Sequence, residues 1–271
     1  MFTQFKNLFL TVALFCFFSC HSNGENRVLL VGTVHNATQN VNADSIYNLL
    51  LKFKPDIILM ELDSTFFYDD FTYKTLFDGN EMIATTRYKM NFPNVQIRPI
   101  EFERREEYRQ EMGIYPEITN AFGAILQQLM QSKSLTNEEE KSIKKLFFYD
   151  SIITVLKSEK LSVINQIETN TIVDSLNYYK YVKLKELSDN YPVFSTTTLE
   201  DAKKDTVSVK QNFDLYVDFE MNKRNSALAK HAAAIIQQYP SKKIIILVGF
   251  AHKSYILNAL RKNGIQCLFE L

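Results

Sequence analysis

The chain has 271 residues, which is enough for one α/β domain with a large core or for two domains at most. Its formal net charge is zero and it has no dense run of lysine and arginine, so the composition excludes a basic surface that would attract nucleic acid. It has seven glycines and six prolines, so most of it is predicted to form regular helices and strands.

The first 19 residues have the pattern of an export signal. Lys6 precedes an apolar run over residues 7–18, which is too short to span a membrane comfortably. Ser19 and Cys20 follow this run, and a polar tether is predicted over residues 20–26. The arrangement is similar to a bacterial lipoprotein signal with Cys20 as the lipidated residue. Phe17 stands where such signals usually have leucine, and an ordinary signal peptide or an uncleaved anchor is the alternative.

If the signal is removed, the mature chain is a lipid-anchored protein of the cell envelope, at the outer membrane or in the periplasm. Cys267 then remains as a single cysteine, which cannot form an internal disulfide and is expected to be a small core residue. Residues 27–271 are predicted to form one domain.

A strand–helix–strand unit opens this domain. Residues 27–34 are apolar throughout, as buried parallel strands are. Residues 44–53 carry apolar side chains at helical spacing, and a second apolar strand is predicted over residues 56–62. A right-handed crossover would make these two strands parallel neighbours or near-neighbours in one sheet.

The middle of the chain is predicted to be mainly helical. Residues 66–91 are interpreted as helix, and residues 95–102 as a third strand that lies near a sheet edge because it contains proline. A helical insertion is predicted at about residues 104–190, and a polar loop over residues 190–209. One long helix is then expected over residues 213–239.

The end of the chain repeats the pattern of its start. Residues 243–252 again form an apolar strand that ends in Val-Gly-x-x-His, and residues 267–271 are predicted to be a last strand. Two of the four histidines of the chain, His35 and His252, therefore occupy matched positions. The fold class expected is α/β, with a central, mainly parallel (mixed) sheet surrounded by helices.

Three side chains that can do chemistry follow predicted strands. His35, Glu61 and His252 lie at the carboxyl ends of their strands, where open α/β sheets bind ligands. Two imidazoles and a carboxylate form a usual ligand set for a catalytic divalent metal. The same set without a metal can activate water by general acid–base catalysis. Gly32 and Gly249 are expected to allow a sharp turn and to keep the site uncrowded.

Three further residues are candidates for supporting roles. Asp63 is expected on the same side as Glu61, where it could orient a histidine. Arg224 lies on the apolar stripe of its helix, so it needs a carboxylate or a developing oxyanion as partner; a surface pair with Glu220 is the alternative. Asn225 is expected to hydrogen-bond a backbone group at a strand end.

Each of these candidates also has an ordinary interpretation. His35 could be a polar residue at a strand end, and Glu61 could cap a helix. Glu101 and Glu103 are interpreted as part of a solvated charged surface, because Arg104-Arg105-Glu106-Glu107 follows them. His231 is interpreted as a core or surface residue of its helix.

Four motifs together resemble the TraB/Tiki/GumN family, which shares a broader superfamily with erythromycin-esterase-like and ChaN-like proteins. They cover nearly the whole chain after residue 26. The motifs are Gly32-Thr33-Val34-His35, Pro55-Asp56-Ile57-Ile58-Leu59-Met60-Glu61-Leu62-Asp63, Arg224-Asn225 and Val248-Gly249-Phe250-Ala251-His252.

The resemblance implies one cleft faced by both Gly-x-x-His motifs, with His35, Glu61, Arg224 and His252 as the active-site set. Tiki-like members are regarded as metal-dependent proteases, erythromycin-esterase-like members as hydrolases that work without metal, and ChaN-like members bind haem. One departure is Lys253-Ser254-Tyr255, where the family often has small residues. It predicts a more crowded and more cationic cleft mouth.

Three functions are therefore expected in turn. The first is a metal-dependent hydrolase of peptide bonds, in which His35, Glu61 and His252 hold a divalent metal and Arg224 stabilises the oxyanion. The second is a metal-independent, esterase-like hydrolase with the same residues. The third is a non-enzymatic envelope protein that binds haem or another ligand. The partners expected are a peptide or small-molecule substrate and a lipid bilayer through Cys20, but no nucleic acid.

Overall fold

The structure, a computed structural model, describes residues 27–115 and 117–271. The predicted signal peptide, the tether over residues 20–26 and the lipidation site Cys20 lie outside these residues. Among the residues described, no helix is both long and apolar enough to cross a membrane.

A four-stranded parallel sheet lies at the centre of the fold, which confirms the predicted α/β class. Its strands are β1 (Val28–Thr33), β2 (Ile57–Met60), β3 (Gln96–Pro99) and β6 (Ile244–Gly249), in the order β1-β6-β2-β3. The strand from the end of the chain therefore lies between the first two, so β1 and β2 are near-neighbours. Thr33 pairs with Gly249 in register, which aligns the ends of the two repeated motifs.

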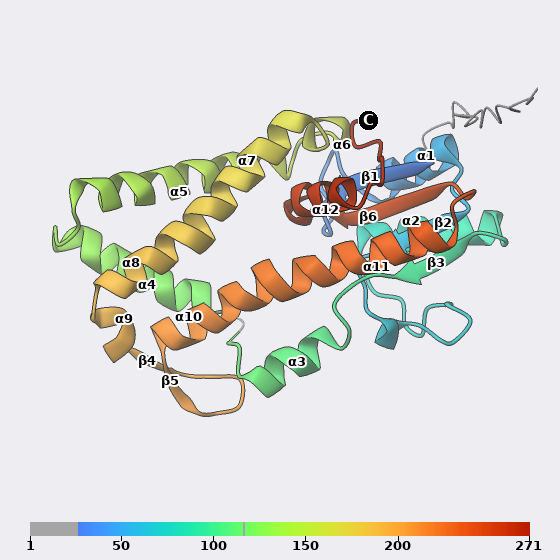
Figure 1. The fold of residues 1–271 in the computed structure, drawn as a ribbon. Coiled ribbons are helices and arrows are strands. Elements are labelled where there is room, and N and C mark those ends of the chain that lie inside the picture. Colours follow the sequence, from blue (N-terminus) through green and yellow to red (C-terminus); the bar gives the residue numbers. More distant parts are fainter. Residues whose placement is uncertain (1–26, 116) are drawn as a thin grey trace, which may run out of the picture.

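Helices cover both faces of the sheet (Figure 1). Helices α1 (Ala43–Phe53) and α2 (Asn80–Asn91) pack on one face, and α11 (Asn225–Gln238) and α12 (Phe250–Lys262) pack on the other. The connections that contain α1 and α2 run from β1 toward β3 across the sheet, whereas those that contain α11 and α12 run back toward β1. Because right-handed crossovers of opposite direction lie on opposite faces of a sheet, the two pairs of helices cover different faces.

A helical lobe continues from β3 and has a core of its own, in which Phe122, Phe194 and Phe213 stack together. This agrees with the helical insertion predicted for this part of the chain. Its elements are α3 (Arg105–Met112), α4 (Ile118–Gln131), α5 (Asn137–Leu156), α6 (Leu161–Ile164), α7 (Ile167–Asn177), the π-helix η2 (Tyr178–Lys183), α8 (Leu184–Asn190) and α9 (Val193–Thr196).

One continuous helical run joins the lobe to the sheet (Figure 1). It consists of α10 (Val209–Val217), the π-helix η3 (Asp218–Arg224) and α11. The predicted long helix is thus present and begins four residues earlier than residue 213, because the side chain of Ser208 caps its start.

Two segments differ from their predictions because local turns replace the expected structure. Residues 66–91 were expected to be helical, but α2 begins only at Asn80, and the preceding segment has just the 3₁₀ turn η1 (Ser64–Phe66). Asp70 accepts a hydrogen bond from Thr72 N and supports a turn there. The predicted polar loop over residues 190–209 contains α9 and a hairpin of β4 (Thr198–Glu200) and β5 (Thr206–Ser208).

The last predicted strand is reduced to one bridge. Leu268 pairs with Leu29 in parallel, and its backbone bonds Val28 and Leu30 beside β1, but residues 267–271 do not form a regular strand. Cys267 packs partly buried against the core under α11 and α12, as expected, and burial raises the pKa of its thiol to about 11.

Candidate active site

The carboxyl edge of the sheet gathers the predicted site residues. His35 follows β1, Glu61 follows β2, and His252 lies in the first turn of α12, directly after β6. The helices that follow the neighbouring strands β1 and β6 lie on opposite faces of the sheet, which is the type of position where α/β sheets bind ligands. A cleft of about 520 Å³ is present here.

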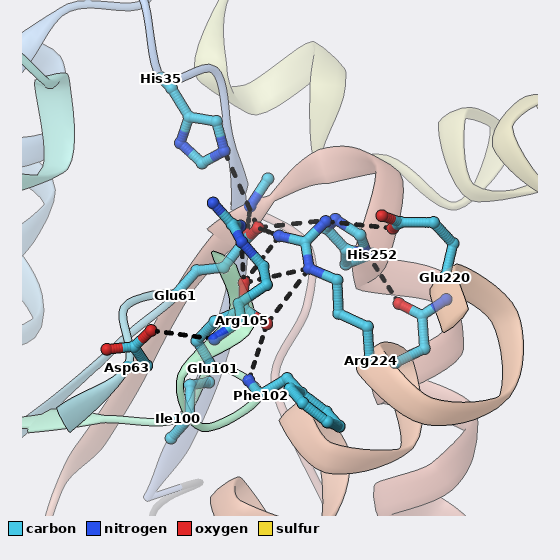
Figure 2. Close-up of polar contacts among 12 residues, drawn as sticks. His35, Glu61, Asp63, Ile100, Glu101, Phe102, Arg105, Glu220, Arg224 and His252 are labelled. Atoms are coloured by element: carbon cyan, nitrogen blue, oxygen red, sulfur yellow. Dashed lines mark hydrogen bonds and ion pairs between the residues drawn. The ribbon is translucent and has the colours of Figure 1, made fainter. Parts of the chain in front are cut away.

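The carboxylate of Glu61 is the centre of the site (Figure 2). Its Oε2 accepts a hydrogen bond from Gly249 N at 2.6 Å, and its Oε1 accepts one from Arg224 Nη2 at 2.5 Å. The Nε2 atoms of His252 and His35 lie 3.5 and 3.9 Å from Oε1. Burial by itself would raise the pKa of Glu61. The charges of His252 and His35 when these rings are protonated, together with the permanent charge of Arg224, hold it below its ordinary value. Glu61 is therefore an ionised carboxylate.

His35 is held by the carboxylate of Glu81, which was not among the predicted site residues. Its Nδ1 lies 3.0 Å from Oε1 of Glu81, in the first turn of α2, and Thr33 Oγ1 also donates to Glu81. The hydrogen bond with Glu81 raises the pKa of His35 above its ordinary value, against the effect of burial. The side chain of His35 is still 57% exposed, so its Nε2 faces both Glu61 and the cleft.

Burial also tends to raise the pKa of Glu81, but the hydrogen bond and charge of His35, with the Thr33 hydroxyl, lower it overall. An ionised Glu81 accepts the Nδ1 proton of His35 and leaves the lone pair of Nε2 toward the cleft. No sequence signal marks Glu81, because only the packing of α2 beside β1 brings it to this histidine.

His252 has the opposite environment. Its side chain is only 15% exposed, and burial, more than any neighbouring charge, lowers its pKa below the ordinary value. Its Nδ1 lies 2.7 Å from Oδ1 of Asn225, at the start of α11. Asn225 therefore holds the second histidine and not, as predicted, a backbone group at a strand end. His252 is neutral in the ordinary pH range.

Arg224 lies at the end of η3 and binds three carboxylates. Its Nη2 bonds Glu61 and, at 2.7 Å, Glu101; its Nε also bonds Glu101, and its Nη1 bonds Glu220 at 3.2 Å. Both alternatives considered for Arg224, a carboxylate at the strand edge and a pair with Glu220, are thus realised together.

The prediction for Glu101 was wrong. This residue follows β3 and is buried, and it also accepts a hydrogen bond from Arg105. The run of charges after it suggested a solvated surface, but the end of β3 lies at the same edge as the other strand ends. A position directly after a strand was the signal that could have identified it.

Asp63 does not orient a histidine. It caps η1 by accepting a hydrogen bond from Thr65 N at 2.9 Å, and it accepts a longer one from Arg105 N at 3.4 Å. The strand ends at Met60, so the alternation that was expected to point Asp63 toward Glu61 does not reach it.

The two motif glycines have different roles. A Cβ at Gly249 would lie 3.2 Å from His35 Nε2 and 3.4 Å from Glu61 Oε2, so this glycine does keep the site uncrowded. A Cβ at Gly32 would lie 2.7 Å from the Cβ of Phe250, so Gly32 allows α12 to pack close to β1 and does not serve a turn at the site.

The prediction that Lys253 makes the cleft mouth cationic was wrong. It is fully buried, and its Nζ donates to the carbonyl oxygens of Asn165 at 2.7 Å and Phe269 at 2.6 Å. Burial lowers the pKa of its ammonium group to about 8. The lysine therefore ties the C-terminal segment to the fold, away from the cleft.

The fit of a metal ion can be judged from the donor atoms. Arg224 and Gly249 N already occupy the two oxygens of Glu61, and an arginine at 2.5 Å stands where a cation would bind. In the part of the chain that the structure describes, no three His, Cys, Asp or Glu side chains are grouped so that they could hold an ion. As they lie here, His35, Glu61 and His252 do not fit a metal.

No family model and no curated protein matches the chain. A solved erythromycin esterase, a histidine-to-asparagine mutant in its open conformation, is similar, with a TM-score of 0.30 and 14% sequence identity. The likeness covers 83% of this chain and only 60% of that chain, so this chain spans less than two thirds of its neighbour. Membership of the TraB/Tiki/GumN family stays a prediction.

Proposed function

We propose that this protein is a hydrolase that cleaves an ester or amide bond by general acid–base catalysis, with His35 as the base. The observation that carries the proposal is the pair of His35 and Glu81. Glu81 holds Nδ1 of the ring at 3.0 Å, while the exposed side presents Nε2 to the cleft. A carboxylate behind a histidine fixes its tautomer and makes it a stronger base.

The proposed reaction begins when Nε2 of His35 removes a proton from a water molecule in the cleft. The water oxygen bonds to the carbonyl carbon of the substrate and a tetrahedral intermediate forms. The protonated His35 then gives its proton to the leaving oxygen or nitrogen as the bond to that atom breaks. Glu81 stabilises the imidazolium between these two steps.

The other predicted catalytic residues are proposed to position the site. Arg224 fixes one oxygen of Glu61, and Gly249 N fixes the other. Three carboxylates balance the charge of Arg224, which supports a positioning role over the stabilisation of an oxyanion. His252, neutral and held by Asn225, packs against Glu61 and completes this support.

The test is turnover of p-nitrophenyl esters and of a peptide library by the wild type, His35→Ala and a control, His231→Ala. His231 lies in α11 and bonds the backbone of Ile100, outside the cleft. We expect His35→Ala to lose roughly 10²- to 10⁴-fold in kcat/KM and His231→Ala to retain activity. Equal activity of His35→Ala and wild type would contradict the proposal.

Chelation distinguishes this reaction from the metal-dependent alternative. We expect turnover to survive exhaustive chelation, and we expect protein purified without chelators or an oligohistidine tag to contain no stoichiometric metal. Loss of activity on chelation, with a metal that disappears in His35→Ala, would favour the metal-dependent peptidase instead.

We also propose that the protein is exported and anchored in the cell envelope through Cys20. The apolar run over residues 7–18 and the polar tether after Cys20 support this. Metabolic labelling with palmitate in a bacterial host should mark the wild type and not Cys20→Ser. Equal labelling of both, or of neither, would contradict the anchor.

A further inference from the structure

The two walls of the cleft differ in their chemistry. One wall consists of the charged and polar groups at the strand ends, around Glu61 and Arg224. The other comes from the irregular segment after β2 and from the first turn of α2. Its apolar side chains are Leu62, Phe66, Phe77 and Met82, and three acidic residues of the same two segments, Asp63, Asp78 and Glu81, also line the cleft. The apolar side chains of this second wall belong to neither Gly-x-x-His motif and take no part in the proposed acid–base step.

Two of the apolar side chains of this wall are aromatic. The rings of Phe66 and Phe77 meet edge to face, with centroids 5.7 Å apart and an interplanar angle of 67°. Phe77 is nevertheless 42% exposed. Contact between an aromatic ring and water is unfavourable, and a ligand ring that covered Phe77 would remove that contact and add a favourable ring–ring interaction.

The wall is fixed relative to His35. Asn80, at the start of α2, donates from its backbone N to the carbonyl of His35 at 3.0 Å and from its side chain to the carbonyl of Val34 at 2.7 Å. Phe77 N bonds the sulfur of Met82 at 3.2 Å, and Lys74 N bonds the carbonyl of Phe66 at 2.9 Å. A group bound on the two rings is therefore held at a set position beside the proposed base.

The volume also fits a small ligand. A cleft of about 520 Å³ is of the size that binds small molecules, and such sites combine apolar walls with a few placed polar groups. A ring-sized group can lie on Phe66 and Phe77 while the bond next to it lies near His35.

We infer that the substrate is an ester or amide that carries an apolar, ring-sized group, and that Phe66 and Phe77 bind this group. This inference rests on the proposed hydrolase function. Phe77 is then a specificity-determining residue, since it distinguishes substrates by the apolar area that they cover.

The experiment compares methyl acetate, which has no ring, with methyl phenylacetate, for the wild type, Phe77→Ala and Leu76→Ala, and measures the released acid by titration. Leu76 is the matched control, because it is the neighbouring residue, is 61% exposed and lies outside the cleft lining. We expect the wild type to prefer the phenylacetate by about tenfold or more in kcat/KM. Phe77→Ala should lose most of this preference, because its rate on the phenylacetate should fall much more than its rate on the acetate, while Leu76→Ala should behave as the wild type.

A binding measurement separates this inference from the proposed reaction. Calorimetric titration of His35→Ala with N-benzylacetamide should show saturable binding. In the double variant that also carries Phe77→Ala, the affinity should be about tenfold weaker. If no ester is hydrolysed but N-benzylacetamide binds and Phe77→Ala weakens that binding, the aromatic subsite of Phe66 and Phe77 is supported and the hydrolase proposal fails. If esters are hydrolysed with equal preference by all three proteins, or if N-benzylacetamide does not bind, the subsite is overturned.

Discussion

The two Gly-x-x-His motifs are nearly the same in sequence and end in opposite environments. His35 leaves the sheet in a loop, is mostly exposed and has a raised pKa because of Glu81. His252 enters α12, is mostly buried and has a lowered pKa because of that burial. A repeated motif therefore sets where a side chain leaves the sheet, whereas the neighbouring elements set the pKa of that side chain.

The largest expected effect is the loss of kcat/KM when His35 is replaced, and comparison with His252 tests the different roles of the two histidines. Because His35, unlike His252, has both a carboxylate partner and an open Nε2, His35→Ala should lose roughly 10²- to 10⁴-fold in kcat/KM. His252→Ala should lose only about tenfold, through a displaced Glu61. Steady-state kinetics on one ester measure both. A larger loss in His252→Ala than in His35→Ala would reverse the assignment of the base.

The next largest effect is the loss of stability when Arg224, the partner of Glu61, is replaced. Arg224→Met would leave the buried carboxylate of Glu61 without its arginine and that of Glu101 with Arg105 alone, so we expect a loss of about 3–5 kcal/mol in the free energy of unfolding. Arg87→Met, which breaks an exposed pair with Asp44, should cost less than about 1 kcal/mol. Urea denaturation measures both variants. Similar costs for the two would mean that Arg224 does not hold the site together.

The glycines of the two motifs give a matched pair of smaller effects. Gly32→Ala would force its Cβ against the backbone of α12 at Phe250 and should cost about 1–3 kcal/mol of stability. Gly249→Ala should leave the stability nearly unchanged but lower kcat/KM by roughly tenfold, because its Cβ would displace His35 and Glu61. Denaturation and kinetics on both variants check this; the same outcome for both glycines would contradict their different roles.

The smallest effect is a shift in pH dependence. His35 must be unprotonated to act as a base, and its pKa lies above the ordinary value of 6.5. The rate should therefore fall as the pH decreases through that raised pKa. Glu81→Gln removes the carboxylate that raises it, so the acid limb of kcat/KM should move to lower pH.

Asn225→Ala, which removes the partner of the other histidine, should not move this limb. The pH profiles of the wild type and both variants provide the measurement. A shift in Asn225→Ala without one in Glu81→Gln would assign the titrating base to His252.

Much of the fold was predictable because its signals are local. The apolar runs around Val28–Thr33 and Ile244–Gly249 identify buried parallel strands, and the spacing of apolar residues identifies the helices. The segment before Asn80 was mistaken for helix, since a turn around Asp70 depends on side-chain hydrogen bonds that apolar periodicity does not show.

The α/β class and the positions of His35, Glu61 and His252 after strands follow from short segments of the chain, because strand ends and motif spacing are local properties. The position of β6 between β1 and β2, through which these three residues meet, depends on long-range packing. Long-range packing also decided the partners Glu81 and Glu101, which come from elements far along the chain. Burial and pairing depend on such packing, and they set the charge of each group in the site.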